Sequence, residues 1–152
     1  MLKKIKIAVI GATGYTGLDL IHLLSRHPKV IIKYLCATKN LGKKISFFDK
    51  RIKKKLPTIS SLKKISWKNI DLVFLSLPNG EAQKIIKKTF YKFNHLKYID
   101  LSADFRIQDP RIYKKNYGRD HKAKNLIKES IYSISEFSKS KIKNYRIIAN
   151  PG

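Results

Sequence analysis

The stretch Ile5–Gly17, IKIAVIGATGYTG, decides how this chain is expected to fold. An apolar run typical of a buried strand, Ile7–Ile10, passes directly into a turn that contains three glycines. A helical pattern follows at once, and its apolar residues recur at helical spacing: Leu18, Leu20, Ile21, Leu23 and Leu24. The stretch therefore predicts a strand, a glycine-rich turn and a helix in direct succession.

The three glycines have the spacing G-x-x-G-x-x-G, a variant of a dinucleotide-binding fingerprint. Gly11 permits a tight turn with positive φ, Gly14 lets the backbone approach phosphates, and Gly17 lets the helix pack closely on the strand. The free amide groups at the N-terminus of the helix would then face the pyrophosphate. The alternative is a tight strand-to-helix turn in another kind of α/β fold.

Length and cysteine content narrow the class of protein. The 152 residues suffice for one domain, and no run reaches the apolar length of a membrane span. The single cysteine, Cys36, cannot form an internal disulfide, so we expect a reducing cytoplasm. His and Cys residues do not occur at the spacing of metal ligands, and no metal is expected.

The net charge of +24 comes from 34 basic and 10 acidic residues. Such a charge normally favours nucleic-acid binding. However, 28 of the basic residues are lysines spread over every segment, and the chain is also rich in Ile and Asn, which AT-rich codons supply. We therefore interpret most of the charge as solvated lysines and expect neither a nucleic-acid nor a membrane partner. A basic nucleic-acid-binding domain is the alternative.

Strand-like and helix-like patterns alternate along the rest of the chain. Strands are predicted at 30–37, 71–77, 97–101 and 145–149, and helices at 81–91, 110–115 and 124–129; residues 40–69 indicate a loop, a short helix and an edge strand. This alternation predicts an α/β fold with a Rossmann-type, doubly wound, mostly parallel sheet, as one nucleotide-binding domain over residues 1–152. Ligands of such sheets bind beyond the carboxyl ends of the strands. We expect five segments to meet there: residues 11–13, 36–39, 77–80, 101–106 and 150–152.

The end of the second strand bears on the choice of nicotinamide cofactor. An NAD site usually has Asp or Glu about 20 residues beyond the glycines, on the ribose 2′-hydroxyl. Thr38 and Lys39 stand there instead. A hydrogen bond to a charged group contributes about 1.5–3 kcal/mol, so a hydroxyl and an ammonium favour the 2′-phosphate of NADP(H). The alternative is that Lys39 is another solvated lysine.

Five segments carry a family resemblance: IAVIGATGYTG, LPNG, YIDLSADFRIQDP, YKKNYGRDH and ANPG. In this order they resemble N-acetyl-gamma-glutamyl-phosphate reductase, the arginine-pathway member of the semialdehyde dehydrogenase group. The resemblance implies NADP-dependent reductive dephosphorylation of N-acetyl-glutamyl 5-phosphate to the semialdehyde. In that family a cysteine directly after NPG attacks the acyl phosphate, phosphate leaves, and NADPH reduces the thioester while a histidine of a second domain assists.

The resemblance also implies the site residues. Those on the cofactor are Gly11, Thr13, Gly14, Tyr15, Thr16, Gly17, Thr38, Lys39, Pro78, Asn79 and Gly80; those on the substrate side are Ser102, Arg106, Asn150, Pro151 and Gly152. Arg106 would grip the substrate phosphate with paired hydrogen bonds, or else form an ion pair with Asp104 or Asp109. Asp104 is interpreted as structural rather than catalytic, and His121 as a residue that orders the crevice.

The resemblance places no catalytic residue within the 152 residues. It puts the nucleophilic cysteine directly after Gly152, and the catalytic histidine and the dimerisation surface in a second domain that the sequence lacks. We therefore expect this chain to bind NADP(H) without catalysing the reduction, and the full-length enzyme to be a homo-oligomer that takes a small acyl phosphate.

Two other functions remain open. Aspartate-semialdehyde dehydrogenase shares the chemistry, although LSADFRIQDP and YGRDH fit the acetylglutamyl enzyme better. A non-catalytic NADP-binding module would also need the glycine turn, but it has no reason to carry LSADFR or NPG.

Overall fold

The computed structural model describes residues 4–151. The chain divides into two compact units, Met1–Ser76 and Leu77–Gly152. Each unit contains its own strands and its own share of the predicted site residues.

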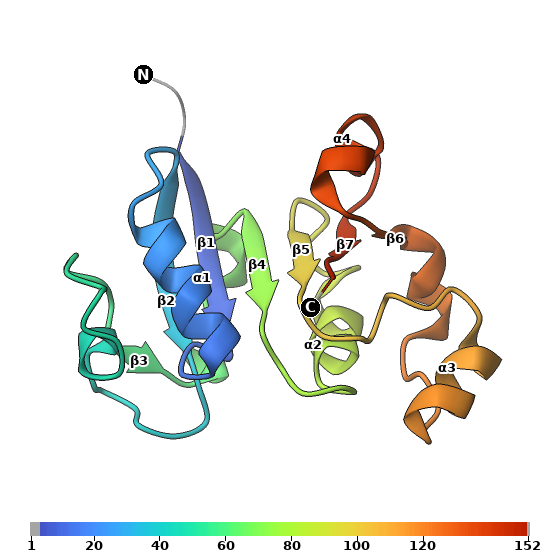
Figure 1. The fold of residues 1–152 in the computed structure, drawn as a ribbon, viewed down its shortest axis with the longest axis horizontal. Coiled ribbons are helices and arrows are strands. Elements are labelled where there is room, and N and C mark those ends of the chain that lie inside the picture. Colours follow the sequence, from blue (N-terminus) through green and yellow to red (C-terminus); the bar gives the residue numbers. More distant parts are fainter. Residues whose placement is uncertain (1–3, 152) are drawn as a thin grey trace. The chain divides into compact units, whose positions relative to one another are not determined.

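The first unit is built on four parallel strands in the order β3-β2-β1-β4 (Figure 1). Their bounds are Ile5–Ile10 for β1, Val30–Cys36 for β2, Ile59–Ser60 for β3 and Leu72–Leu75 for β4. The strand β1 lies between β2 and β4, and Ile7, Ala8 and Val9 have no exposed surface. A strand covered on both faces needs the continuous apolar run that the sequence shows there.

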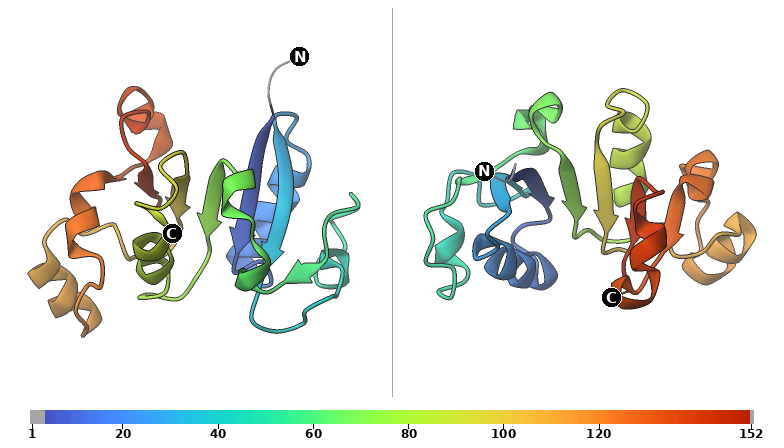
Figure 2. Two further views of the ribbon diagram at one scale, coloured as in Figure 1. Left: turned by 180° about the vertical axis from the view of Figure 1, so that it is seen from behind. Right: turned by 90° about the horizontal axis from the view of Figure 1, so that it is seen from above.

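Helices cover both faces of these strands. On one face lies α1, Tyr15–Ser25, and on the other lies η3, a 3₁₀-helix at Trp67–Asn69 (Figure 2). Two further 3₁₀-helices are η1, Ile45–Phe47, and η2, Leu62–Lys64. Ile21 of α1 is fully buried, but Leu23, which belongs to the same apolar pattern as Ile21 in the sequence, is 67% exposed and does not belong to the buried face. Two residues turn a helix by about 200°, which carries Leu23 to the opposite side from Ile21.

The second unit has three parallel strands in the order β5-β7-β6. Their bounds are Lys97–Asp100 for β5, Ser130–Tyr132 for β6 and Ile147–Ala149 for β7. Helices α2, Ala82–Thr89, and α4, Ser135–Ile142, lie on opposite sides of β5 and β7 (Figure 2). Helix α3, Pro110–Tyr117, and the 3₁₀-helix η4, Lys124–Glu129, precede β6. Tyr98, Phe105 and Tyr113 are the largest fully buried side chains of this unit.

The predicted fold class is confirmed, because strands alternate with helices and every described strand pair is parallel. Most predicted elements are present with shorter bounds, and the strand expected at 145–149 begins only at Ile147. The segment 124–129 is a 3₁₀-helix rather than an α-helix. Residues 40–69 contain three 3₁₀-helices where one short helix was predicted, and β6 and α4 were not predicted. That residues 1–152 form one nucleotide-binding domain stays a prediction.

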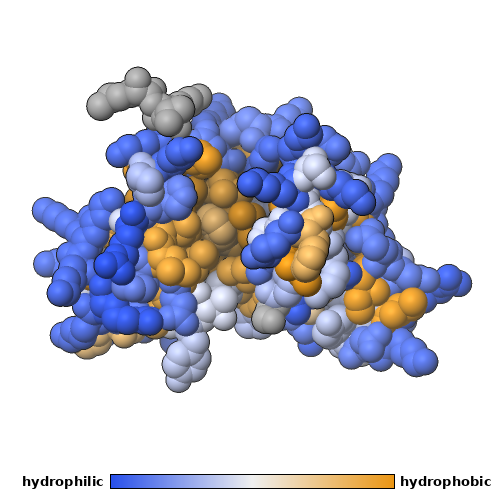
Figure 3. Space-filling model, turned by 45° about the horizontal axis from the view of Figure 1, so that its top comes forward, coloured by the Kyte–Doolittle hydropathy of each residue, from blue (hydrophilic) through white to orange (hydrophobic). Residues whose placement is uncertain are grey.

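Hydrophilic side chains cover most of the face drawn in Figure 3, with apolar patches between them. A hydrophilic surface is expected of a chain in which 28 of 152 residues are lysines. Within residues 4–151, no helix is long and apolar enough to cross a membrane. Nor do three or more His, Cys, Asp or Glu side chains of that range gather into a possible metal site.

Candidate nucleotide-binding site

The glycine turn of the first unit is fastened to the end of β2. The amide groups of Gly11 and Ala12 both donate to the carbonyl oxygen of Cys36, at 2.9 and 3.0 Å. Gly11 has a φ of 87°, a conformation that residues with a side chain rarely adopt. The positive φ expected for Gly11 is therefore confirmed, and the turn follows the last residue of β1 without a break.

Gly17 and Gly14 differ in how much room surrounds them. A Cβ atom at Gly17 would lie 2.2 Å from the carbonyl oxygen of Gly11, which real side chains do not tolerate. A Cβ atom at Gly14 would meet the same oxygen at 3.6 Å, an ordinary contact. Gly17 is thus required for the close approach of α1 to the turn, whereas the position of Gly14 has room for a Cβ atom.

The N-terminus of α1 is open. Gly14 is the N-cap residue and has no side chain that could cap the helix. The first amide with a partner inside the helix is that of Leu18, which donates to the carbonyl oxygen of Gly14 at 2.8 Å. The amides of Tyr15, Thr16 and Gly17 precede it and have no acceptor within the helix. Tyr15 is 94% exposed and Thr16 is exposed. This end of the helix fits a phosphate group, because helical amides point out of it and no side chain caps it.

Thr38 and Lys39 follow the carbonyl group of Cys36 that holds the turn. Both side chains are exposed, and neighbouring Asn40 has a φ of 61°. The amide of Ala37 donates to the carbonyl oxygen of Ser60 at 3.1 Å, which ties the start of this loop to β3. The first unit therefore brings the predicted 2′-phosphate residues to the same strand end as the glycine turn.

In the second unit, hydrogen bonds join the LPNG and LSADFR segments. The side-chain oxygen of Asn79 accepts from the amide of Ala103 at 3.3 Å, and the amide of Gly80 donates to Asp104 Oδ1 at 2.7 Å. Gly80 has a φ of 91°. Pro78, Asn79 and Gly80 thus form a loop, here called the 78–80 loop, that is fixed to the segment following β5.

Asp104 serves as a cap for α2 from a distant part of the sequence. Its Oδ2 atom accepts from the amide of Gln83 at 3.1 Å, and its Oδ1 atom also accepts from the hydroxyl group of Tyr113 at 2.8 Å. Asp104 is fully buried. Burial and the bond to this carboxyl group raise the pKa of Tyr113 far above its usual range. The structural role expected of Asp104 is what these contacts describe, although its helix-capping function has no signal in the local sequence.

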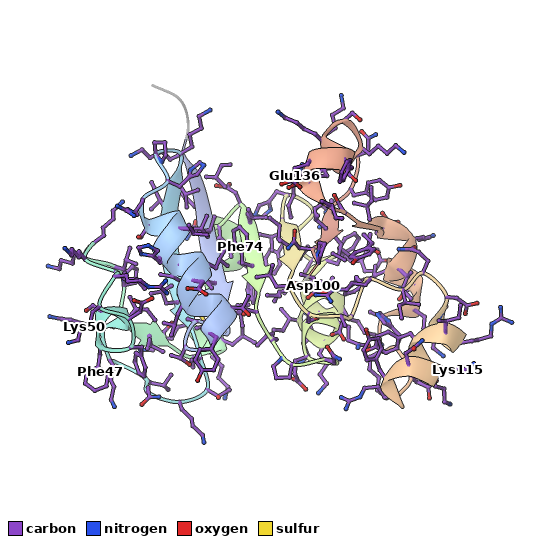
Figure 4. The ribbon with its side chains drawn as sticks, in the orientation of Figure 1. Phe47, Lys50, Phe74, Asp100, Lys115 and Glu136 are labelled. Carbon is purple, nitrogen blue, oxygen red and sulfur yellow. The ribbon has the colours of Figure 1, made fainter. Side chains whose placement is uncertain are left out.

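Asp100 ends β5 in a buried position (Figure 4). Its Oδ1 atom accepts from the amide and the hydroxyl group of Ser102, at 2.9 and 2.7 Å. Its Oδ2 atom is buried and has no hydrogen-bond partner among the described residues. Burial therefore raises the pKa of Asp100 to about 6, and the bonds from Ser102 offset this only in part. The Ser102 hydroxyl group is committed to this contact.

Arg106 holds the backbone beside the end of β7. Its Nε atom donates to the carbonyl oxygen of Asn150 at 3.1 Å and its Nη2 atom to that of Leu101 at 3.0 Å. The amide of Asn150 donates in turn to the carbonyl oxygen of Asp100 at 2.8 Å.

The ion pair considered for Arg106 is wrong. Asp109 pairs with Arg111 at 2.9 Å, and Asp104 is committed to α2. The role of Arg106 on a substrate phosphate stays a prediction, as do those of Ser102, Asn150 and Pro151. Gly152 lies outside the described residues.

His121 is buried and its two ring nitrogens have different partners. Nε2 lies 2.7 Å from the carbonyl oxygen of Asp104, and Nδ1 accepts from the amide of Ala123 at 3.1 Å. This pair of contacts specifies the neutral ring with its proton on Nε2. Burial lowers the pKa of His121, which agrees with a neutral ring. His121 therefore orders the segment around Asp104, and its role in ordering the crevice stays a prediction.

Comparison with known proteins places the chain in a family. The family described as "Semialdehyde dehydrogenase, NAD binding domain" matches residues 6–145. The chain belongs to this family. N-acetyl-gamma-glutamyl-phosphate reductase of Afipia carboxidovorans is 41% identical over 155 aligned residues, which include 100% of this chain and 44% of the relative. The chain thus spans less than half the length of that relative.

Solved structures of semialdehyde dehydrogenases share the fold. Aspartate semialdehyde dehydrogenase II of Vibrio cholerae, complexed with ASA, aligns with a TM-score of 0.63 at 16% identity, over 99% of this chain and 42% of that one. Aspartate semialdehyde dehydrogenase of Candida albicans, with NADP, aligns with a TM-score of 0.57 at 19% identity, over 97% and 42%. These likenesses confirm the predicted α/β fold.

Proposed function

We propose that this chain is the cofactor-binding part of an N-acetyl-gamma-glutamyl-phosphate reductase, an oxidoreductase of arginine biosynthesis. The observation that carries this proposal is the 41% identity, over the whole chain, to a relative of that name. The aspartate semialdehyde dehydrogenases among the solved structures are 16% and 19% identical, a level at which only the fold is shared. The acetylglutamyl reaction is therefore favoured over the aspartyl reaction.

Two sets of residues would hold the nucleotide. In the first unit, the open amides at the N-terminus of α1 and the turn from Gly11 to Gly17 bind the pyrophosphate. In the second unit, the 78–80 loop contacts the nicotinamide-side ribose. When bound, NADPH supplies the hydride that converts the acyl group to an aldehyde.

Lys39 and Thr38 favour binding of NADP(H) over NAD(H). Both are exposed and follow the strand end that holds the glycine turn. The position carries an ammonium and a hydroxyl group where an acidic residue would repel a 2′-phosphate. The Candida albicans structure that shares this fold was solved with NADP.

On the substrate side, Arg106 and Asn150 shape the backbone that leads into the NPG segment. The Arg106 guanidinium uses Nε and Nη2 on carbonyl groups, so Nη1 is the group that would face the substrate phosphate. We further propose a cysteine directly after Gly152 as nucleophile, a homo-oligomeric full-length enzyme, and a cytoplasmic location, where the free thiol of Cys36 stays reduced.

Titration of the 152-residue chain with NADPH tests the cofactor assignment. Binding should quench or shift NADPH fluorescence, with NADH weaker by about tenfold, as one charge-assisted contact predicts. The chain alone should release no phosphate from the acyl phosphate. If NADPH does not bind, or if the chain turns over substrate, the proposal fails.

The gene downstream of the codon for Gly152 tests the rest of the proposal. A cysteine codon at the next position is expected, followed by a second domain. Any other residue there would contradict thioester chemistry on this loop.

A further inference from the structure

A buried hydrogen-bond network holds the 78–80 loop. The amides of Gly80 and Gln83 both donate to the carboxyl group of Asp104, at 2.7 and 3.1 Å. They lie at the start of α2, where helical amides lack partners. Asp104 thus fixes the loop and the helix that follows it at one point.

A second layer holds Asp104 in place. The Tyr113 hydroxyl group donates to Oδ1 of Asp104 at 2.8 Å and accepts from Nε2 of Gln83 at 3.0 Å. The side-chain oxygen of Gln83 accepts from the amide of Lys122. Asp104, Gln83 and Tyr113 are all fully buried, so a lost bond in this network leaves a polar group without water to replace its partner.

The 78–80 loop also contacts Arg119, whose side chain is not part of this network. Arg119 lies over the loop and donates from Nη1 to the carbonyl oxygen of Asn79 at 3.1 Å. A Cβ atom at Gly80 would sit 3.0 Å from that nitrogen, and the φ of 91° disfavours a side chain there as well. In this loop Pro78 is exposed, Asn79 is half-buried and Gly80 is buried, and Asp104 holds the conformation through the amide of Gly80.

We propose that Asp104, held by Tyr113, is a positioning residue that keeps the 78–80 loop in the conformation that receives the nicotinamide half of NADPH. This inference rests on the proposed function. A ligand that needs one conformation binds more weakly in proportion to the fraction of molecules that hold it. A network of three buried bonds around one carboxyl group keeps that fraction near one.

Comparing the binding of two ligands distinguishes this positioning role from a general effect on stability. NADPH carries the nicotinamide half, whereas 2′,5′-ADP carries only the adenosine half with the 2′-phosphate, which the first unit would bind. The variants are Asp104→Asn, which turns an acceptor into a donor facing an amide, and the milder Tyr113→Phe, which removes only the hydroxyl group. Tyr98→Phe is the matched control, because Tyr98 is equally buried and its hydroxyl group bonds to Thr89 at the other end of α2, at 2.9 Å.

Wild-type chain and the Tyr98→Phe variant should bind both ligands alike. Asp104→Asn should raise the Kd for NADPH about tenfold, and Tyr113→Phe about threefold, while the Kd for 2′,5′-ADP stays unchanged. These values correspond to loops that hold the binding conformation in about a tenth and about a third of the molecules. Amide hydrogen exchange at Gly80 should accelerate in both variants. Unchanged NADPH binding in Tyr113→Phe, or equal losses for both ligands, would overturn the positioning role.

The proposed function fails in a different way. If the wild-type chain binds neither ligand, the nucleotide assignment is overturned and the positioning role with it, even where Gly80 exchanges faster in the variants. If the wild-type chain binds both ligands and the variants do so equally well, only the positioning role is lost.

Discussion

At the scale of single residues, Gly17 and Gly14 of the turn should respond differently to the same substitution. Gly17→Ala places a Cβ atom 2.2 Å from the Gly11 carbonyl oxygen, so we expect it to lower the free energy of unfolding by about 3 kcal/mol, an overpacking cost. Gly14→Ala meets its nearest atom at 3.6 Å and should change the stability by less than about 1 kcal/mol. Urea unfolding measures both values. Equal losses would contradict the close approach of α1 to the turn.

The Gly14→Ala variant also separates binding from folding. Its new methyl group would stand at the open N-terminus of α1, where the pyrophosphate is proposed to lie. We expect a folded chain whose Kd for NADPH is at least about tenfold higher, because a misplaced phosphate loses one charge-assisted bond or more. Wild-type affinity in this variant would place the phosphates elsewhere.

Asp100 should make the stability depend on pH in the opposite sense to most carboxyl groups. Its pKa is raised by burial from 3.8 to about 6, so the folded state binds more protons than the unfolded state between those values. Its contribution is therefore full below pH 4 and is lost as the pH rises through 6, by about 3 kcal/mol. Asp100→Asn should remove this slope.

Urea unfolding at pH 4 to 7 measures the effect as the difference between wild type and Asp100→Asn. The difference is needed because His121 acts in the other direction: its pKa is lowered, so its contribution is lost as the pH falls below about 6.5. The charge of Asp104 also raises the pKa of Asp100, and Ser102 lowers it. Parallel pH profiles of the two proteins would show that Asp100 is not the titrating group.

At the scale of elements, the loop after β2 should decide between the two nicotinamide cofactors. Lys39→Ala should raise the Kd for NADPH about tenfold and leave that for NADH unchanged, because only the former carries the 2′-phosphate. Lys33→Ala is the matched control, since Lys33 is an exposed lysine of β2 that precedes the strand end. Equal effects of the two substitutions would mean that the general charge, rather than Lys39, attracts the nucleotide.

The sequence predicted the elements whose apolar pattern is strong and left out β6 and α4, whose pattern is weak. The apolar runs before Gly11 and Pro78 lie between neighbouring strands or helices, and burial on both sides leaves a strong signal. By contrast, β6 has three residues, and α4 carries exposed Phe137 and two lysines, so neither shows a periodic apolar face. Their places depend on pairing with β7 and on tertiary contacts.

The site could be predicted in part for the same reason. Gly11 and Gly17 were recognised because backbone geometry dictates glycine at those positions. The contacts of Arg106 and Asp104 were not, because their partners are backbone groups of distant segments, which carry no residue-type signal. The ion pair proposed for Arg106 paired it with nearby acidic residues, yet its guanidinium donates to the carbonyl groups of Leu101 and Asn150.

At the scale of the whole molecule, the net charge of +24 should make stability depend on salt. Like charges destabilise a compact state, and at 0.5 M ionic strength most interactions between exposed lysines are screened. We expect the Tm to rise by at least about 3 °C between 10 mM and 0.5 M NaCl, which corresponds to about 1 kcal/mol for a chain of this size. A charge-reversing variant in an exposed lysine run, Lys54→Glu, should be stabilised at low salt and respond less to it. A Tm that falls with salt would contradict this.

The buried position of Cys36 supplies a reporter that needs no engineering. Cys36 is the single cysteine of the 152 residues, is 1% exposed, and lies on β2, which pairs with β1 on one side and β3 on the other. Burial raises the pKa of its thiol, so a thiol-specific dye will react only after β2 separates from its neighbours. The labelling rate therefore measures how often the first unit opens. Because the Cys36 carbonyl group also anchors the glycine turn, NADPH at 100 times its Kd should slow this labelling about a hundredfold.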